Sequence, residues 1–435
     1  MNTFLREFLK WIKVLMTVSV FLLTLGSCKL IESFSIAGKV GKEINRSEVF
    51  SKYFTGLSVY DPMTGESVID INADKYFTPA SNIKILTLAT YLELGLDSIP
   101  SFWVHPDQSI TPLGDPTFLH PDFPSQPAFT NIKKIPGRNL VVRIPLKTSS
   151  YGPGWAWDDY HYNFQPERSS FPIYGNVLRV QLKNNTLNVS PSFFTPYIDT
   201  ASTNPSRLHK FNLFNIPQSK LRDTTELEIP FITEEELLEV LLTDTLYKSI
   251  EFSAFSGGQI TDTVYNQSAK SVMALMMQRS DNFIAEQLLI NAQLITGRSS
   301  IESMLYYTNS TVFQDTPDRL IWVDGSGLSR YNMVTPRSMV AVLEKIRNKL
   351  TWNEIQYIFP TGGVSGTIRN WYQSESPYVF AKTGTLRHNH NLSGFLKTRS
   401  DRILIFSFMN NHYPFSNGEV KREMEKILTY IRDNY

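Results

Sequence analysis

The 435-residue chain contains one cysteine, Cys28, so the protein cannot form a disulfide within itself. An excess of one charge sign is also absent, because 42 Lys and Arg residues stand against 41 Asp and Glu residues, a net charge of +1. That balance excludes the clustered basic surplus of a nucleic-acid binder, and we expect no nucleic-acid partner. The chain has no internal repeat and no low-complexity tract.

Apolar and aromatic residues are abundant. Hydrophobic residues make up 42% of the chain, which includes 28 Phe, 20 Tyr and 7 Trp. This composition is that of an ordinary globular protein with two or three domains and a large core.

The N-terminus has the pattern of an export signal. Three basic residues (Arg6, Lys10 and Lys13) precede an apolar run over residues 14–25, which is short for a membrane-spanning helix. The run ends at Leu25-Gly26-Ser27-Cys28, which resembles a bacterial lipobox and predicts lipidation of Cys28. A lipidated Cys28 would anchor the exported protein to a bacterial membrane, facing the periplasm. The alternative is a signal-anchor helix with an incidental cysteine.

Changes in residue pattern divide the chain. We expect a lipoprotein signal peptide over residues 1–27, a tether over 28–44, and a catalytic domain formed by 45–96 and 261–435. Residues 97–260 are rich in Pro, Ser, Asn and aromatics and lack helical periodicity, which indicates a mostly β inserted region.

Strand patterns occur near both ends of the catalytic domain. Residues 55–60 and 66–72 read as a hairpin, and a helix follows with Thr78 as its N-cap and Gly95 at its C-terminus. Near the C-terminus the strands are predicted at 379–382, 392–396 and 403–409. Strands at both ends around a helical middle predict one sheet built from distant segments.

Ser81-Asn82-Ile83-Lys84 lies at the start of the predicted helix. Residues i and i+3 share a helix face, so the Ser81 hydroxyl and the Lys84 amine can meet. A serine hydroxyl needs a neighbouring base to become a nucleophile, and a desolvated lysine can serve as that base. No other serine in the chain is followed by lysine three residues later.

Ser280-Asp281-Asn282 lies between two predicted helices. Its side chains are suited to relaying a proton and holding a substrate amide. A second Ser-x-Asn occurrence, at Ser202, precedes a proline in a loop-like region, and we interpret it as a decoy.

Lys382-Thr383-Gly384 lies on a predicted strand and is followed by Thr385. A cation beside a hydroxyl suits a substrate carboxylate, and the glycine lets the substrate backbone approach closely. An exposed edge strand with an incidental lysine is the alternative.

The three motifs, in this order, are those of penicillin-binding proteins and class A β-lactamases. The chain resembles the class C low-molecular-mass penicillin-binding proteins, the D-Ala-D-Ala carboxypeptidase/endopeptidase family S13 of the penicillin-binding protein 4 type. Further stretches that match the family begin at Thr78, Gly114, Gly154, Asp324 and Gly366. The resemblance implies an α/β fold, the penicilloyl-serine transferase (β-lactamase/transpeptidase-like) sandwich of an antiparallel sheet and helices.

The resemblance also implies the roles. Ser81 would attack the penultimate D-Ala carbonyl of a peptidoglycan stem peptide, Lys84 would take its proton, and Ser280 and Asn282 would complete the relay. The substrate carboxylate would bind to Lys382, Thr383, Gly384 and Thr385, and the N–H groups of Ser81 and Thr385 would form the oxyanion hole. β-Lactam antibiotics would be covalent inhibitors. The family needs no metal and no cofactor, and the sequence leaves the oligomeric state open.

Two other functions fit part of this pattern. A β-lactamase would need a deacylating carboxylate, and no Glu-x-x-Leu-Asn segment follows Asn282. A non-catalytic peptidoglycan-binding lipoprotein would have no need of Lys84.

Three further features have simple structural interpretations. His388-x-His390 is expected to be a solvated loop rather than a metal pair. Trp155 and Trp157 are expected to pack the insert against the catalytic domain rather than to stack on sugar. Asp324-Gly325-Ser326-Gly327 is expected to form a tight turn.

Overall fold

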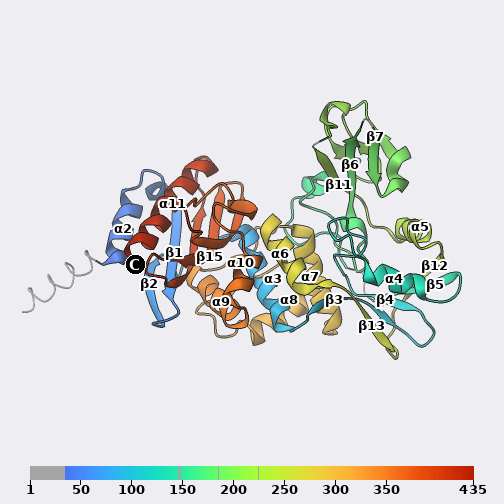
Figure 1. The fold of residues 1–435 in the computed structure, drawn as a ribbon, viewed down its shortest axis with the longest axis horizontal. Helices are drawn as coiled ribbons and strands as arrows, with labels where there is room; N and C mark the ends of the chain where they lie inside the picture. The colour runs from blue at the N-terminus through green and yellow to red at the C-terminus, as the bar shows by residue number, and fades with distance from the viewer. Residues whose placement is uncertain (1–34, 146–147, 185, 224) are drawn as a thin grey trace, which may run out of the picture.

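The computed structural model describes residues 35–145, 148–184, 186–223 and 225–435. The predicted signal peptide (1–27) and Cys28 lie outside the described residues. In Figure 1 a sheet holding both ends of the described chain lies at one end of the long axis, helices fill the middle, and the inserted region lies at the other end. Over the described residues, no helix combines the length and the apolar character that a bilayer crossing requires.

The main sheet is antiparallel, with strand order β14-β15-β16-β1-β2. Its strands are β1 (Phe54–Asp61), β2 (Glu66–Ile71), β14 (Val379–Leu386), β15 (Asn389–Lys397) and β16 (Ile403–Asn411). β16 is buried along nearly its whole length because it is central and covered on both faces. The pairing of β1 with β16 confirms the prediction of one sheet built from distant segments.

Helices cover both faces of this sheet. One face packs against a cluster of helices: α3 (Lys84–Glu93), α6 (Ala269–Arg279), α7 (Asn282–Ile295), α8 (Ile301–Thr311), α9 (Pro336–Lys349) and α10 (Trp352–Ile358). The other face packs against α2 (Ile36–Arg46), α11 (Asn417–Asn434) and the short helices η1 (Phe50–Lys52) and η7 (Gly366–Ile368). Successive residues Phe408 and Met409 belong to the two different cores, as strand alternation requires. The predicted sandwich of antiparallel sheet and helices is confirmed.

The prediction of a tether over residues 28–44 is wrong for its last nine residues. They belong to α2, whose side chains Val40 and Ile44 are buried in the core on the α11 side of the sheet. Their i, i+4 spacing places both on one helix face, and Ser35 caps the helix by accepting a hydrogen bond from the Gly38 N–H at 3.0 Å.

Within its described residues, the inserted region has its own core and three sheets. The largest has the order β12-β5-β4-β3-β13, with β3 (Ser98–Val104), β4 (Ile110–Pro112), β5 (Asn139–Ile144), β12 (Ser249–Ala254) and β13 (Asp262–Ser268). A second, β11-β6-β7, contains β6 (Val177–Lys183), β7 (Thr186–Ser190) and β11 (Glu226–Pro230). Short strands β8 (Ile198–Asp199), β9 (Ser206–Arg207) and β10 (Phe214–Asn215) form the third. The helices of the region are α4 (Pro127–Lys134), α5 (Glu235–Leu246), η3 (Trp157–His161), η4 (Tyr174–Asn176), η5 (Ser192–Tyr197) and η6 (Gln218–Lys220).

The predicted boundary between residues 260 and 261 is wrong. Residues 262–268 form β13, which pairs with β3 inside the insert, and the catalytic helices resume only at Ala269 in α6. Sequence pattern alone did not show which strands β13 would join, because pairing is decided in space.

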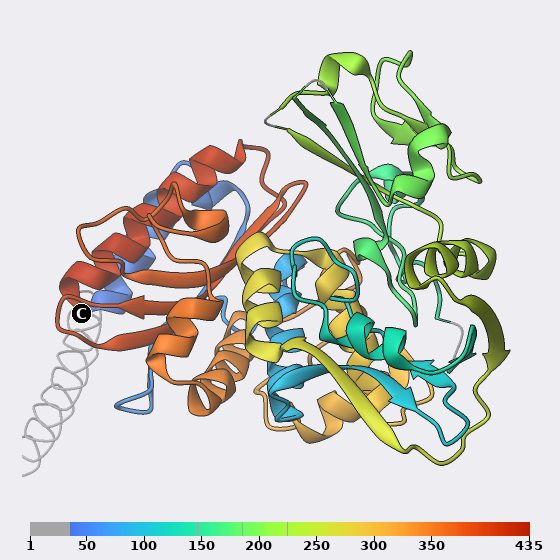
Figure 2. The same cartoon turned by 45° about the vertical axis from the view of Figure 1, so that its right-hand side comes forward.

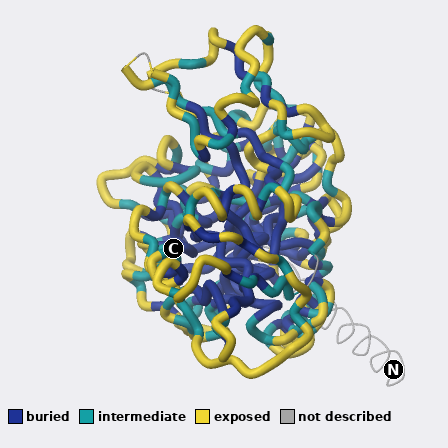
Figure 3. The backbone as a smooth tube through the Cα atoms, turned by 90° about the vertical axis from the view of Figure 1, so that its right-hand side faces the viewer, coloured by how far each residue is buried: buried dark blue, intermediate teal, exposed yellow. Residues whose placement is uncertain are grey.

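The insert lies against the catalytic helices (Figure 2). Buried side-chain amides of α7 fasten the two parts together. The Gln287 amide of α7 donates to the Ser169 carbonyl at 2.7 Å, and the Asn291 amide, one turn further along, donates to Pro100 at 2.8 Å and Leu113 at 2.6 Å. Figure 3, viewed from the side of the insert, shows buried backbone in the interior of the molecule and exposed backbone around its outside. The insert is therefore part of the same packed body as the helices.

Candidate active site

Ser81 and Lys84 meet at the start of the central helix. Residues Ala80–Ile83 form a 3₁₀ turn, η2, and the α-helix α3 begins at Lys84. The prediction of Ser81 in an α-helical first turn capped by Thr78 is therefore wrong in detail, because the N-cap of α3 is Ile83. A 3₁₀ turn has three residues per turn, so residues i and i+3 lie directly above one another. The Lys84 Nζ donates to the Ser81 Oγ at 3.0 Å.

Lys84 is completely buried and its ammonium has three hydrogen-bond acceptors. Besides Ser81, Nζ donates to the Asn282 Oδ1 at 2.5 Å and to the Ser326 carbonyl at 2.7 Å. Burial lowers the pKa of Lys84 to about 8, against the opposing effect of the Asp281, Asp324 and Glu286 carboxylates. A lysine with this pKa is partly neutral near physiological pH and can accept a proton.

The Ser280-Asp281-Asn282 turn separates α6 from α7. Ser280 ends α6 in the left-handed conformation (φ 60°, ψ 39°), and the Asp281 side chain caps α7 by accepting from the Ile284 N–H at 2.8 Å. This sharp reversal brings Ser280 and Asn282 to the same side as Ser81. The Asn282 amide nitrogen donates to the Phe164 carbonyl of the insert at 2.7 Å, which orients its oxygen toward Lys84.

The Lys-Thr-Gly motif lies on β14, the edge strand of the main sheet. Lys382 is completely buried, and its Nζ donates to the Ser280 Oγ at 2.7 Å, so the third motif contacts the second directly. Burial and the Lys84 charge lower the pKa of Lys382 well below its usual value. The edge-strand alternative, an exposed and incidental lysine, is wrong because the Lys382 side chain crosses to Ser280.

Gly384 lets β14 pass close to the turn that carries Ser81. A Cβ atom at this position would lie 2.2 Å from the Pro79 carbonyl oxygen and 2.8 Å from the Asn82 nitrogen. Thr385, the next residue, is exposed on this edge, and its hydroxyl lies 2.7 Å from His390 Nδ1. The structure therefore brings together all eight predicted site residues of the chain's described part.

Several residues of the site carried no predicted role. The Ser326 carbonyl accepts from Lys84, the Phe164 carbonyl accepts from Asn282, and the Thr383 hydroxyl donates to the Thr367 hydroxyl at 2.7 Å. Ser326 and Thr367 belong to stretches that match the family, which was the available signal. Phe164 acts through its backbone, and a backbone contact leaves no side-chain signature in a sequence.

The Asp324 loop is a tight turn, as predicted, held by a buried carboxylate. Asp324 accepts from the Gly327 N–H at 2.9 Å, the Ser329 N–H at 2.7 Å and the Asn332 amide at 2.7 Å. It also accepts from the Trp155 indole N–H at 2.8 Å, so Trp155 joins insert and catalytic domain as predicted. The same prediction is wrong for Trp157, which is 77% exposed.

The two histidines of His388-x-His390 lie in different environments. His388 is exposed at the turn between β14 and β15, whereas His390 is buried in β15, and burial lowers its pKa to about 3. The expected solvated loop is therefore wrong for His390. Across the described ranges, no group of three or more His, Cys, Asp or Glu side chains is arranged to hold a metal ion.

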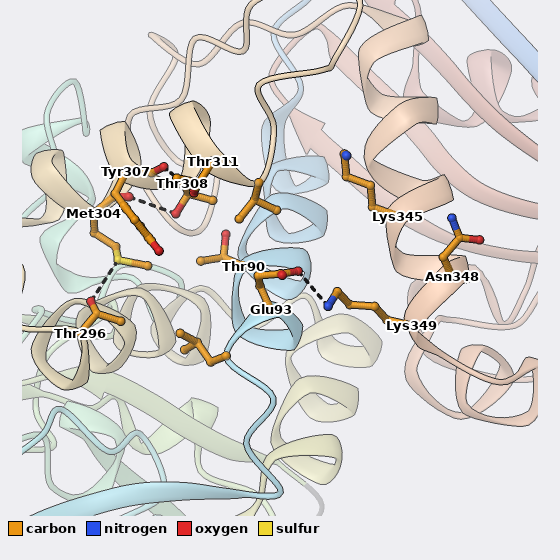
Figure 4. Close-up of a pocket in the computed structure, with 12 residues that line it drawn as sticks. Thr90, Glu93, Thr296, Met304, Tyr307, Thr308, Thr311, Lys345, Asn348 and Lys349 are labelled. Atoms are coloured by element: carbon orange, nitrogen blue, oxygen red, sulfur yellow. Dashed lines mark hydrogen bonds and ion pairs between the residues drawn. The ribbon is translucent and has the colours of Figure 1, made fainter.

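One cleft lies beside the catalytic residues, and a second cleft lies away from them. A cleft of about 230 Å³ is lined by Ser280 and Asn282 together with Phe164, Arg179 and Arg279, and opens beside the catalytic groups. A cleft of about 460 Å³, shown in Figure 4, lies at the other end of α3, between α8 and α9. In it Lys349 is paired with Glu93 at 2.9 Å, and the threonine hydroxyls bond to backbone carbonyls of their own helices. This second cleft presents no group suited to catalysis.

The arrangement supports nucleophilic catalysis. It contains a serine hydroxyl, a buried amine in contact with it, a second cation beside a hydroxyl, and a strand edge along which a peptide backbone can bind. These are the parts needed to transfer an acyl group to serine.

Comparisons with known proteins are consistent with acyl transfer to a serine. Residues 263–434 match the model of the D-Ala-D-Ala carboxypeptidase 3 (S13) family. A D-alanyl-D-alanine carboxypeptidase of Haemophilus influenzae is 26% identical over 345 residues, 70% of this chain and 71% of that protein. A penicillin-sensitive carboxypeptidase of Dictyostelium discoideum is 23% identical over 448 residues, 86% of this chain and 85% of that protein.

Solved structures show the same fold. The crystal structure of penicillin binding protein 4 from H. influenzae superposes with a TM-score of 0.67 at 20% identity, covering 91% of this chain and 98% of that one. The same H. influenzae protein has also been solved in complex with a β-lactam. The family match over residues 263–434, the two relatives and the geometry of the three motifs show that the chain is similar to the D-Ala-D-Ala carboxypeptidase (S13) family of serine peptidases.

Proposed function

We propose that this protein is a serine D-alanyl-D-alanine carboxypeptidase/endopeptidase that cleaves peptidoglycan stem peptides through an acyl-enzyme on Ser81. The observation that carries the proposal is the buried Lys84 amine, 3.0 Å from the Ser81 hydroxyl and hydrogen-bonded to Asn282. Burying an ammonium is costly, so its presence in contact with a serine favours a role in proton transfer.

In the acylation step, neutral Lys84 takes the Ser81 proton as Oγ attacks the carbonyl carbon of the penultimate D-Ala. The N–H groups of Ser81 and Thr385 stabilise the developing oxyanion. The C–N bond then breaks, and the departing amine receives a proton through Lys84 and Ser280. The Ser280 hydroxyl is suited to this relay because it also accepts a hydrogen bond from Lys382 at 2.7 Å.

The substrate carboxylate is assigned to the β14 edge. Lys382 and the Thr383 hydroxyl supply charge and a hydrogen bond there, and Gly384 leaves room for the peptide backbone. Water attacks the acyl-enzyme in the second step, with Lys84 again as the base. A β-lactam would follow the same first step and leave Ser81 acylated.

The test is D-Ala release from a pentapeptide stem, measured by mass spectrometry, together with labelling by a fluorescent penicillin on a denaturing gel. Ser81→Ala should abolish both signals. Ser280→Ala should reduce both, while Ser202→Ala, in the other Ser-x-Asn stretch, should leave them unchanged. Persistent D-Ala release by Ser81→Ala would refute the nucleophile. Rapid penicillin turnover without a stable adduct would favour a β-lactamase, and no activity in the unmodified chain would favour a binding lipoprotein.

We also propose that Cys28 carries lipid and holds the protein on a bacterial membrane, facing the periplasm. The support is the basic segment, the short apolar run and the position of the sole cysteine after it. Metabolic labelling with a clickable fatty acid should mark the protein, and Cys28→Ser should lose the label and move to the soluble fraction. Label retained by Cys28→Ser would contradict lipidation of this residue.

A further inference from the structure

A buried carboxylate that the proposed mechanism does not use is connected to the catalytic lysine through the backbone of a single residue, Ser326. Glu286, on α7, is 2% exposed. Its Oε1 accepts from the Ser326 N–H at 2.7 Å, and the carbonyl of the same Ser326 accepts from Lys84 at 2.7 Å. Both polar groups of one backbone residue are thus used, one by the carboxylate and one by the lysine.

The second oxygen of Glu286 faces the insert. Its Oε2 accepts from Arg168 Nη1 at 3.4 Å, and Arg168 is itself fixed by carbonyls of the insert, donating to Ser149 at 3.1 Å and Tyr151 at 2.8 Å. A continuous chain of contacts therefore runs from the insert through Arg168, Glu286 and Ser326 to Lys84.

Glu286 is not needed to hold the loop as a whole. The Gly327 and Ser329 N–H groups are bound by Asp324, which leaves the Ser326 N–H as the specific contact of Glu286. The Ser326 N–H belongs to the Gly325–Ser326 peptide unit, whose carbonyl accepts from the Thr87 hydroxyl at 2.7 Å. The carbonyl that Lys84 uses belongs to the next peptide unit, whose N–H is bound by Asp324. Loss of the Glu286 contact would therefore release Ser326 on its N-terminal side, directly before the carbonyl that binds Lys84, while the rest of the turn stays in place.

We propose that Glu286 is a positioning residue for Lys84: by holding the Ser326 N–H it restrains this residue, whose carbonyl directs the lysine amine toward Ser81, and Arg168 links this arrangement to the insert. The inference rests on the proposed function, in which Lys84 is the base. The inference gives the insert a role in catalysis, because the insert contributes Arg168, which pairs with Glu286 behind the catalytic lysine.

The charges around Glu286 give the proposal a measurable signature. The groups that face it are Arg168 from the insert, Asp324 from the loop and Lys84 from α3. Burial, together with the Asp324 charge, raises the pKa of Glu286 to about 7, and the Glu286 charge in turn raises the pKa of Lys84. Removing that charge should make Lys84 easier to deprotonate.

The experiment measures the second-order rate of acylation by fluorescent penicillin from pH 5 to 10 for the full chain and for Glu286→Gln. In the plot of acylation rate against pH, the rise on the acidic side should occur at lower pH in the variant than in the full chain, because Lys84 loses a neighbouring negative charge. Glu286→Ala, which also removes the acceptor of the Ser326 N–H, should lower the plateau about tenfold to hundredfold, as expected when a reacting group is displaced by a fraction of a bond length. Arg168→Met should move the rise in the same direction as Glu286→Gln, because the Glu286 carboxyl stays protonated to higher pH without its partner.

The matched control is Asp61→Asn, which removes another buried carboxylate paired with an arginine, Arg402, at the far edge of the main sheet. This control should lower the melting temperature without moving the acylation profile. If Glu286→Gln keeps the wild-type midpoint and Glu286→Ala lowers only the melting temperature and keeps the wild-type plateau, the positioning role is refuted. If Glu286→Gln does not fold, the pH at which the acylation rate of Arg168→Met rises tests the positioning role instead. Failure of the unmodified chain to acylate would overturn the proposed function instead, which separates the two results.

Discussion

The chemistry of this protein depends on a cation that the fold keeps out of water. Lys84 is buried in its entirety and still has three acceptors for its three N–H bonds, at Ser81, Asn282 and Ser326. A buried ammonium with satisfied hydrogen bonds stays ordered, while its desolvation lowers the pKa toward the range in which it can act as a base.

The acylation rate of the unmodified protein should therefore rise with pH through the pKa of Lys84, about 8. Below that pH the amine is protonated and cannot accept the Ser81 proton; above it the amine is neutral. The measurement is the rate of fluorescent-penicillin labelling at constant ionic strength. A rate independent of pH between 6 and 9 would contradict Lys84 as the base.

Lys84→Arg should retain the positive charge but lose acylation by about 10²–10⁴-fold, because a guanidinium does not deprotonate in this range. The matched control is Lys345→Arg on α9, whose amine pairs with Asp315 at 2.7 Å on the surface. Equal labelling rates for Lys84→Arg and the unmodified protein would exclude the lysine from proton transfer.

At the scale of elements, the site depends on two backbones that lie unusually close to the turn carrying Ser81. Gly327 and Gly384 both lie against this turn: a Cβ at Gly327 would lie 1.9 Å from the Ala80 carbonyl oxygen, and a Cβ at Gly384 would lie 2.2 Å from the Pro79 carbonyl oxygen. Ala80 itself has a left-handed φ of 50°. The close contacts of both glycines restrain the turn in this conformation.

Gly327→Ala should displace the turn and reduce acylation by at least about tenfold, because the Ser81–Lys84 geometry is lost. The control is Gly297→Ala, which has the same left-handed backbone (φ 68° against 84°) but no atom within 4 Å of the new Cβ. Both variants should lose stability from the strained φ, Gly327→Ala more because of its close contact with Ala80, and only Gly327→Ala should lose labelling. Comparable labelling of the two would show that the close approach is unimportant.

At the scale of the whole molecule, insert and catalytic helices share buried hydrogen bonds. Asn291 on α7 is completely buried, donates to Pro100 and Leu113, and accepts from the Tyr91 hydroxyl at 2.8 Å. Together with the Arg168–Glu286 pair, these contacts tie the insert to the helices on which Asn282 is mounted.

Asn291→Leu should lower the free energy of unfolding by about 1–3 kcal/mol, since it leaves buried carbonyls and a hydroxyl without partners. The insert and the catalytic part should unfold together, so tryptophan fluorescence and penicillin labelling should report one transition in denaturant. Asn348→Leu, exposed on α9, should leave the midpoint unchanged. Separate transitions for the two probes would show that the insert is an independent unit.

Much of this organisation could be predicted from local pattern. Strand alternation and turn residues located β1, β2, β15 and β16, and the spacing of Ser81 and Lys84 predicted their contact. Local pattern failed where partners are distant: β13 was assigned to the wrong domain because its pairing with β3 bridges the insert, and the tether prediction missed the packing of Val40 and Ile44.

The sequence by itself determined the reacting groups, because a serine and a lysine one turn apart, a Ser-Asp-Asn turn and a Lys-Thr-Gly strand are local patterns with local consequences. Only the tertiary structure decided how those groups become reactive. The burial of Lys84, the contact of Lys382 with Ser280, the Ser326 carbonyl and the Glu286–Arg168 pair all join segments distant in the chain. Desolvation and close approach are properties of packing, and packing exists only when the chain is folded.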